Sequence, residues 1–451
     1  MHGTNLSRWT MSYFVVALGA LLLGEILMAA GYGFPSAPIR APETLVLVHV
    51  VAIGWLSLLL CGALFQFVPV LIARPLYSDS LPLPTLLFIV AGLAGLVLGF
   101  LQRAGTIDSG VPLLPYAAAS LTIGFALALW NLGRTLCTVR PLALPARFVA
   151  VALVCLAATV ALGVVFSLVL GLNIRHGALL KVAGQGLPLH VVAGIGGWLT
   201  FAAIGVSYRL LAMFMLSPER DGRRTQAVLW LGTAALAIAI LGGLAALLFD
   251  KGLHLALLAG GVLGLAALGL YGMDVLHLYR ARKRRVIELN SRMAALALIS
   301  LAAAAIMAVV LIGLGQLSER IGAVVFLLVF GWLSGLGLSQ LYKIVAFLTW
   351  LECYGPVLGK TATPRVQDLV DEARARKWFV LYYLSVWAAT AFLLAPHLLG
   401  FRLAVAAMMA ATLGLAVHFA RSRLLSQVSA QSGLPEGARR PHLLVSIPRP
   451  S

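Results

Sequence analysis

Twelve long apolar stretches constrain this chain more than any other feature of its 451-residue sequence. A helix needs roughly 20 consecutive apolar residues to cross the hydrocarbon core of a bilayer. Stretches of this kind predict membrane spans at about 12–33, 44–72, 82–102, 112–133, 147–172, 187–213, 226–249, 252–278, 293–316, 321–350, 378–397 and 400–420. The fold class that follows is an all-α polytopic membrane protein.

The composition agrees with this fold class. The chain is 61% hydrophobic and 11% charged, whereas a typical soluble domain contains about 25% charged residues. Most apolar side chains must therefore face lipid, so the bilayer is the first expected partner. The net charge of +18 would suggest nucleic-acid binding in a soluble protein. Here we expect no nucleic-acid partner and attribute the charge to topology, because Lys and Arg collect on the cytoplasmic side.

The distribution of Lys and Arg predicts the orientation. With the amino terminus inside, most of the 33 basic residues fall in cytoplasmic segments. The outer segments then hold Arg40, Arg103, Arg175, Lys181, Lys251, Arg320 and Arg402. We therefore expect both termini to be cytoplasmic, in a bacterial-type inner (plasma) membrane.

Two segments outside the spans have their own character. The charged loop at 351–377 is a candidate for a short amphipathic helix and for docking of a subunit partner. A twelve-span membrane domain covers 1–424, and the basic segment 425–451 is expected to be a disordered cytoplasmic tail.

Common catalytic and transport signatures are absent from the sequence. The four cysteines form no CxxC pair, and there is no Walker motif, HExxH motif or CxxCH heme attachment site. These absences argue against an ATP-driven pump, a zinc protease and a covalently attached cytochrome. Electrons for any redox reaction would therefore come from a partner protein or a quinol.

A recurring Gly-Trp pair indicates an internal repeat. The pairs are Gly54-Trp55, Gly197-Trp198 and Gly331-Trp332. Each is followed by leucine and a small hydroxyl residue, and an aromatic and a long polar residue come ten and eleven positions after each tryptophan. These columns are Ser57, Thr200 and Ser334; Phe65, Tyr208 and Tyr342; and Gln66, Arg209 and Lys343. The spacing predicts three repeats, at about 1–145, 146–290 and 291–424, that form three arcs of four helices.

Four ionisable residues in or near the outer halves of spans are candidate site residues, since such groups are costly in a membrane. His49 lies ~9 Å from the outer end of its span at 1.5 Å per residue. Glu25 lies at a similar depth in the neighbouring span, while His190 and His254 begin later spans. A neutral imidazole is a good ligand for heme iron or copper, and a carboxylate such as Glu25 can orient it. We predict His49 and His190 as cofactor ligands, and His190, His254 and Glu25 as metal-site residues. The alternative is a hydrogen-bonded Glu25–His49 pair without cofactor.

The pattern His49-x4-Gly54-Trp55-x6-Gly62-x6-Pro69, within twelve spans, resembles subunit I of the heme–copper oxidases and nitric oxide reductases. It is also similar to the NnrS proteins, heme- and copper-containing relatives linked to nitric oxide metabolism. The resemblance implies that His49 ligates a low-spin heme. It implies more loosely that His190 corresponds to the copper-binding histidine of span six.

The sequence also departs from that family at several ligand positions. The stretches 226–249 and 321–350 contain no histidine, although the oxidases have ligands in both spans, and Phe326 occupies the place that matches His49. We therefore expect a divergent protein that binds heme or copper and takes part in nitric oxide or redox metabolism, but no complete oxygen reductase. Two other hypotheses remain open. One is a cofactor-free proton-coupled or metal-ion transporter that uses Glu25 and the histidines as relay groups. The other is an assembly protein that docks partners through its inner loop and tail.

Overall fold

The computed structural model describes residues 7–172, 174–428, 434 and 440–446. Within these residues, twelve helices are long and apolar enough to cross a membrane. Each of them overlaps one of the predicted spans, so the all-helical membrane class is confirmed. The same residues contain no β-strand beyond one isolated bridge between Leu358 and Thr361.

The chain divides into two compact units. Unit 1 combines Met1–Gln66 with Glu288–Ser451, and unit 2 is Phe67–Ile287. This division does not follow the three repeats predicted at 1–145, 146–290 and 291–424. The arrangement in three arcs therefore stays a prediction.

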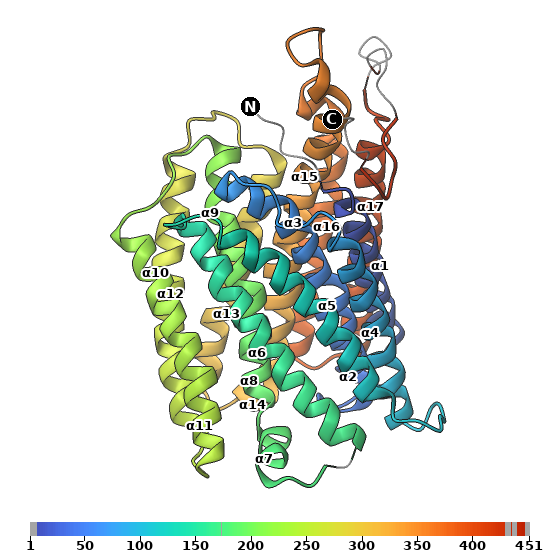
Figure 1. Cartoon of the computed structure of the whole chain (residues 1–451), viewed down its shortest axis with the longest axis vertical. Helices are drawn as coiled ribbons and strands as arrows, with labels where there is room; N and C mark the ends of the chain where they lie inside the picture. Colours follow the sequence, from blue (N-terminus) through green and yellow to red (C-terminus); the bar gives the residue numbers. More distant parts are fainter. Residues whose placement is uncertain (1–6, 173, 429–433, 435–439, 447–451) are drawn as a thin grey trace. The chain divides into compact units, whose positions relative to one another are not determined.

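Unit 1 contains both ends of the described chain (Figure 1). Its helical elements are α1 (Thr10–Ala30), α2 (Pro42–His49), η1 (Val50–Ser57), the first part of α3 (Leu58–Ile72), α13 (Leu289–Gly313), α14 (Leu317–Phe326), η4 (Leu327–Ser334), α15 (Gly335–Tyr354), η5 (Gly355–Val357), η6 (Val366–Leu369), α16 (Glu372–Leu394) and α17 (Leu398–Arg423). Helix α17 packs along α16 and α1, while α13 packs against η4 and α15. These contacts bring the first two spans together with the last four.

Unit 2 contains the six middle spans. Its elements after the end of α3 are α4 (Pro82–Arg103), α5 (Leu113–Leu136), α6 (Leu144–Leu172), α7 (Gly177–Gln185), α8 (Leu187–Val191), η2 (Val192–Phe201), α9 (Ala202–Met215), α10 (Arg223–Ala237), η3 (Ile238–Gly242), α11 (Gly243–Leu248) and α12 (His254–Arg280). The pairs α4–α5 and α10–α12 pack along their lengths, and α6 packs against α5 and η2. The short helix α7 lies in a segment for which we expected no helix.

Glycines allow some of these helices to approach closely. A Cβ atom at Gly92 of α4 would lie 2.7 Å from Cγ of Leu121, and one at Gly124 of α5 would lie 2.7 Å from Cγ1 of Ile89. Each glycine thus receives a large side chain of the partner helix. Small residues at such contacts are the usual basis of helix packing in membranes, where van der Waals contact drives association.

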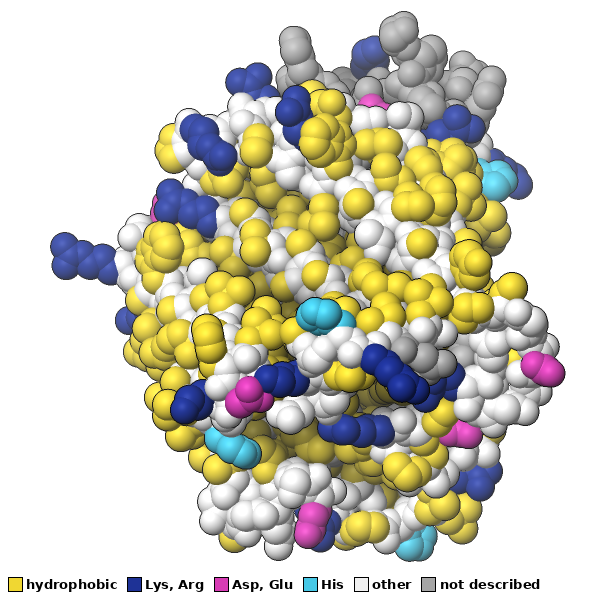
Figure 2. Space-filling model, turned by 60° about the horizontal axis from the view of Figure 1, so that its bottom comes forward, with side chains coloured by type: hydrophobic (Ala, Val, Ile, Leu, Met, Phe, Trp, Pro, Cys, Tyr) yellow, Lys and Arg dark blue, Asp and Glu magenta, His cyan; other side chains and the backbone are white. Residues whose placement is uncertain are grey.

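The surface is that of a lipid-embedded protein. Large apolar side chains such as Val154, Phe249 and Leu255 are 70–78% exposed. In Figure 2 hydrophobic side chains cover much of the visible face, and charged side chains gather in its lower part and along its edges. Exposed apolar area of this extent fits a bilayer environment.

The loop 351–377 differs from its predicted form. Instead of an amphipathic α-helix, residues 351–377 contain the two short turns η5 and η6 before α16 begins at Glu372. The side chain of Asp368 accepts hydrogen bonds from the backbone N–H and the guanidinium of Arg365 at 2.8 and 3.2 Å. Such local bonds compete with helix formation.

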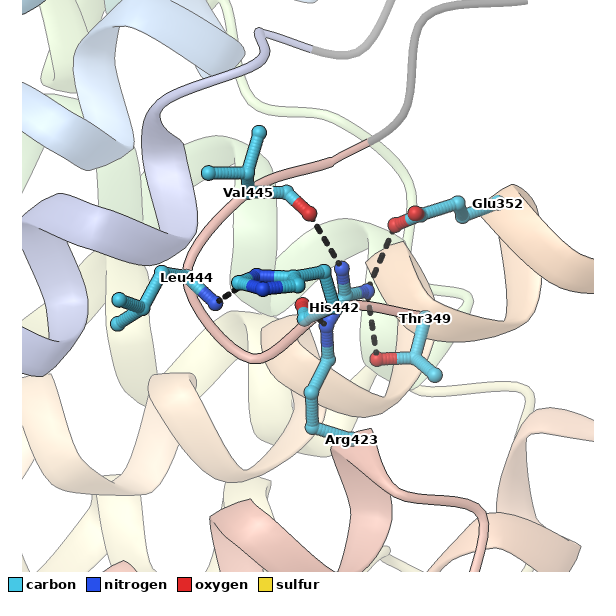
Figure 3. Close-up of polar contacts among 6 residues, drawn as sticks. All are labelled: Thr349, Glu352, Arg423, His442, Leu444 and Val445. Atoms are coloured by element: carbon cyan, nitrogen blue, oxygen red, sulfur yellow. Dashed lines mark hydrogen bonds and ion pairs between the residues drawn. The ribbon is translucent and has the colours of Figure 1, made fainter. Parts of the chain in front are cut away.

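Part of the tail is also held in place (Figure 3). Buried Arg423, at the end of α17, donates from Nε to the carbonyl of His442 over 2.9 Å and from its second terminal nitrogen to Val445 over 3.3 Å. Ser446 N–H donates to the carbonyl of Arg8 over 3.0 Å. The described tail residues 440–446 therefore differ from the predicted disorder, because backbone carbonyls satisfy a buried guanidinium. Residues 429–433, 435–439 and 447–451 of that predicted tail lie outside the described part. The contact with Arg8 places the two ends on the same side of unit 1.

Candidate functional site

The three Gly-Trp pairs all lie within π-helical segments. Gly54-Trp55 belongs to η1, Gly197-Trp198 to η2 and Gly331-Trp332 to η4. In a π-helix the backbone hydrogen bonds join residues five apart, which widens the turn, and such segments are rare and frequent at functional sites. The sequence repeat therefore coincides with a repeated local distortion of the backbone.

The first two copies also share contacts with the span that precedes them. A Cβ atom at Gly62 would lie 2.5 Å from Cβ of Tyr13, and one at Gly205 would lie 2.5 Å from Cβ of Phe148. The rings of Tyr13 and Phe65 are 5.7 Å apart, and those of Phe148 and Tyr208 are 5.6 Å apart. In both copies the glycine accommodates an aromatic residue, which then contacts the aromatic three positions later.

The long polar column is matched between the first and third copies. The backbone N–H of Ser7, just before α1, donates to Oε1 of Gln66 over 2.8 Å. Lys343 pairs with Glu288, just before α13, at 2.8 Å. Both side chains thus bond to a residue just before the span that precedes their own.

His49 is the last residue before η1 and is half-buried. Its Nδ1 lies 2.7 Å from the carbonyl oxygen of Leu45 in the preceding turn. Because a carbonyl can only accept a hydrogen bond, Nδ1 carries the proton and the lone pair of the neutral ring is on Nε2. A histidine held in this way has the tautomer of a metal ligand whose second nitrogen donates to a carbonyl.

Glu25 is fully buried in α1. Its Oε1 accepts a hydrogen bond from Oγ1 of Thr412 in α17 over 2.8 Å. Its Oε2 is buried and has no hydrogen-bond partner among the described residues. The sequence predicted that Glu25 could orient His49. In the structure His49 is hydrogen-bonded to Leu45, and Glu25 is hydrogen-bonded to Thr412.

A group of buried hydroxyls lies beside Glu25. The carboxyl group is close enough to Tyr382 of α16 for the two to interact electrostatically. The Tyr382 hydroxyl donates to the carbonyl of Phe330 in η4 over 2.9 Å, and Ser334 adjoins the same hydroxyl. Ser334 in turn accepts from Nε1 of Trp55 over 2.8 Å. Glu25 therefore interacts with Thr412 of α17 and Tyr382 of α16, and Tyr382 in turn is bonded to η4.

The place that matches His49 in the third copy is filled by aromatic packing. Phe326, the last residue before η4, is 6% exposed. Its ring centroid lies 4.7 Å from that of Phe330 and 5.6 Å from that of Phe401. An apolar cluster therefore stands where the oxidase pattern has a second heme ligand.

His190 is half-buried in unit 2 and packs against α6. Its ring lies edge-on to Phe166 with centroids 5.4 Å apart, and a Cβ atom at Gly163 would lie 3.5 Å from its Cε1. It comes eight residues before Trp198, whereas His49 comes six before Trp55. Two residues are about 200° of helical rotation, so the two histidines do not occupy equivalent positions in their copies.

His254, the first residue of α12, is exposed. Across the described ranges, no group of three or more His, Cys, Asp or Glu side chains could hold a metal ion. A donor set for copper around His190 or His254 is therefore not assembled within this part of the chain. Copper at these residues stays a prediction.

The sequence reasoning missed Asp274, a fully buried acid in α12. Its carboxylate accepts from Oγ1 of Thr225 at 2.8 Å and from the hydroxyl of Tyr208 at 3.1 Å, and it pairs with Arg220 at 3.4 Å. The signal was available, because Asp274 is the only acidic residue of its span. Both carboxylate oxygens of Asp274 have partners, and Arg220 supplies a positive charge beside them. The carboxylate therefore connects α12 to α9 and α10.

Comparison of the sequence with models of protein families finds no match, and comparison with curated proteins finds none either.

Proposed function

We propose that this chain is a divergent relative of the heme–copper oxidases that binds heme through Nε2 of His49. The observation that carries the proposal is the hydrogen bond from Nδ1 of His49 to the carbonyl of Leu45. It selects the tautomer that an axial ligand needs and fixes the orientation of the ring. The position of His49 directly before a π-helical segment of the second span supports it further.

The fit to heme is better than the fit to copper. One imidazole suffices for an axial bond to heme iron, whereas a copper site of the oxidase type takes several donors, and these are not gathered in the part of the chain described here. A bound heme would supply electron transfer or the binding of a diatomic gas such as nitric oxide. The residues of this chain would bind it, orient His49 and exclude water.

The proposal also includes an orientation, an electron donor and a docking place. Both termini would face the cytoplasm of a bacterial-type inner membrane, and a quinol or a partner protein would deliver electrons. The inner loop at 351–377 is the proposed docking place for a subunit partner. Fusion of reporter domains to either end would test the orientation.

An optical spectrum tests the heme proposal directly. The protein is produced with heme supplied, purified in detergent, and its spectrum and metal content are recorded beside those of His49→Ala and His254→Ala. We expect a Soret band that His49→Ala abolishes or shifts and that His254→Ala leaves unchanged, because His254 is exposed. Purified protein without heme, or a spectrum unaltered in His49→Ala, would refute the proposal.

A second candidate function is proton-coupled or metal-ion transport without a cofactor. The observation that favours it is Glu25, a fully buried carboxyl group with one oxygen lacking a partner within the described chain. Such intramembrane acids frequently mark ion and proton pathways. In liposomes, ion-dependent flux that disappears in Glu25→Gln would support this function, and unchanged flux in that variant would exclude it.

A further inference from the structure

We propose that Glu25 is a proton-binding site, in which the carboxyl group is held as a neutral acid. The inference rests on the second candidate function and narrows it, because it identifies the ligand of this residue as a proton and excludes a metal cation. It does not depend on heme binding by His49.

The surroundings of Glu25 disfavour the carboxylate anion. The side chain is 0% exposed, and among the described residues no Lys, Arg or His forms an ion pair with it. Within the described chain, its one hydrogen-bond donor is the hydroxyl of Thr412. A buried charge without a counter-ion costs far more than a buried neutral group with one unsatisfied atom, so such groups neutralise.

The charged and titratable groups on the packed elements do not change this balance. From α17, Arg402 donates from its Nε to the carbonyl of Ala29 over 2.9 Å, one turn beyond Glu25. From α2, His49 donates to Leu45. From α16, Tyr382 presents a neutral hydroxyl that already donates to Phe330. None of these bonds supplies a cation to the carboxyl group.

The oxygens near Glu25 also fit a proton better than a metal ion. Hard cations such as Ca²⁺ take six to eight oxygen ligands, and several of these are usually carboxylates. Here the single carboxyl group receives a hydrogen bond from the hydroxyl of Thr412, and the hydroxyl of nearby Tyr382 is engaged with the carbonyl of Phe330. A proton on Oε2 needs only that oxygen.

Infrared spectroscopy of the full-length protein in lipid nanodiscs tests the inference. At neutral pH we expect a C=O stretching band of a protonated carboxylic acid that is lost in Glu25→Gln. Thr412→Val should shift the same band to higher frequency, since it removes the hydroxyl that donates to Oε1. The control Glu319→Gln changes an exposed acid of unit 1 and should leave the band unchanged.

Three outcomes would overturn the inference. They are a band that persists in Glu25→Gln, absence of the band from wild-type protein, and its loss on addition of Na⁺, Ca²⁺ or Zn²⁺. If Glu25→Gln does not fold, the Thr412→Val shift and the metal titration of wild-type protein still decide it. Loss of the band in Glu25→Gln together with absence of liposome flux would refute the transport function and leave the proton site intact.

Discussion

Trp55 and Ser334 join the first and third copies of the Gly-Trp motif. The indole Nε1 of Trp55 donates to Oγ of Ser334 over 2.8 Å, although 279 residues separate them in the sequence. Trp55 is the tryptophan of the first copy, and Ser334 is the small hydroxyl residue of the third. The repeated columns thus serve as contact points between helices, here between η1 and η4 of unit 1.

This bond predicts energetic coupling between the two residues. Trp55→Phe or Ser334→Ala leaves a buried polar atom without its partner, which costs about 1–3 kcal/mol. In the double variant both partners are gone, so the loss of unfolding free energy should be smaller than the sum of the single losses. Equilibrium unfolding in mixed detergent measures all three variants.

A matched control is available in the third copy. Nε1 of Trp332 is buried and has no hydrogen-bond partner among the described residues. Trp332→Phe should therefore change stability without any coupling to Ser334→Ala. Strictly additive losses for Trp55 and Ser334 would contradict the coupling.

The ion pair of Arg423 and Glu352 should help to hold the tail residues 440–446 in place. Its atoms are 2.7 Å apart, with side-chain exposures of 2% and 8%. Glu352→Gln should destabilise unit 1 by about 3–5 kcal/mol, because it leaves a buried guanidinium without its counter-ion. Arg423→Met should in addition release residues 440–446, since Arg423 also donates to His442 and Val445.

Limited chymotrypsin digestion measures this release. Cleavage after Leu443 or Leu444 should be faster in Arg423→Met than in wild type. Arg421→Met, which alters an exposed neighbour on the same helix, should leave the rate unchanged. Equal cleavage rates in all three proteins would rule out the anchoring role.

Two glycines of unit 1 should respond to alanine in opposite directions. Gly62→Ala places a Cβ atom 2.5 Å from Cβ of Tyr13, and overpacking of this kind costs about 1–3 kcal/mol. Gly19→Ala meets no atom within 4 Å and should stabilise α1 by up to about 1 kcal/mol through helix propensity. Thermal unfolding in detergent distinguishes them, and equal effects would contradict the close contact.

Asp368 in the loop 351–377 should titrate at a lower pH than an ordinary aspartate. Its hydrogen bond from the backbone N–H of Arg365, together with that from the guanidinium, holds the pKa of this carboxyl below its usual range. A lowered pKa in the folded state means that the loop gains stability from Asp368 above the ordinary aspartate pKa. That contribution is lost as the pH falls through the depressed value.

Carbon NMR of protein labelled at aspartate carboxyls can follow this titration, with Asp368→Asn assigning the signal. Arg365→Gln should raise the midpoint only part of the way, because the backbone N–H still donates. A midpoint at the ordinary aspartate value in wild type would contradict the two bonds.

The sequence determined the features that depend on local hydrophobicity and spacing. Span length is a property of about 20 consecutive residues, and all twelve predicted spans therefore correspond to helices in the structure. The Gly-Trp columns and the glycine seven residues after Trp55, Gly62, are local features of the same kind.

Only the tertiary structure decided which polar groups meet. Glu25 and Thr412 are 387 residues apart, and no local pattern indicates that α1 and α17 are neighbours. The sequence suggested His49 as the partner of Glu25 because adjacent spans are usually neighbours, but helix rotation and depth determine which side chains meet. The contacts of Asp274 with α9 and α10 and those of Arg423 with the tail were not predictable for the same reason. Three-dimensional packing decides which side chains meet.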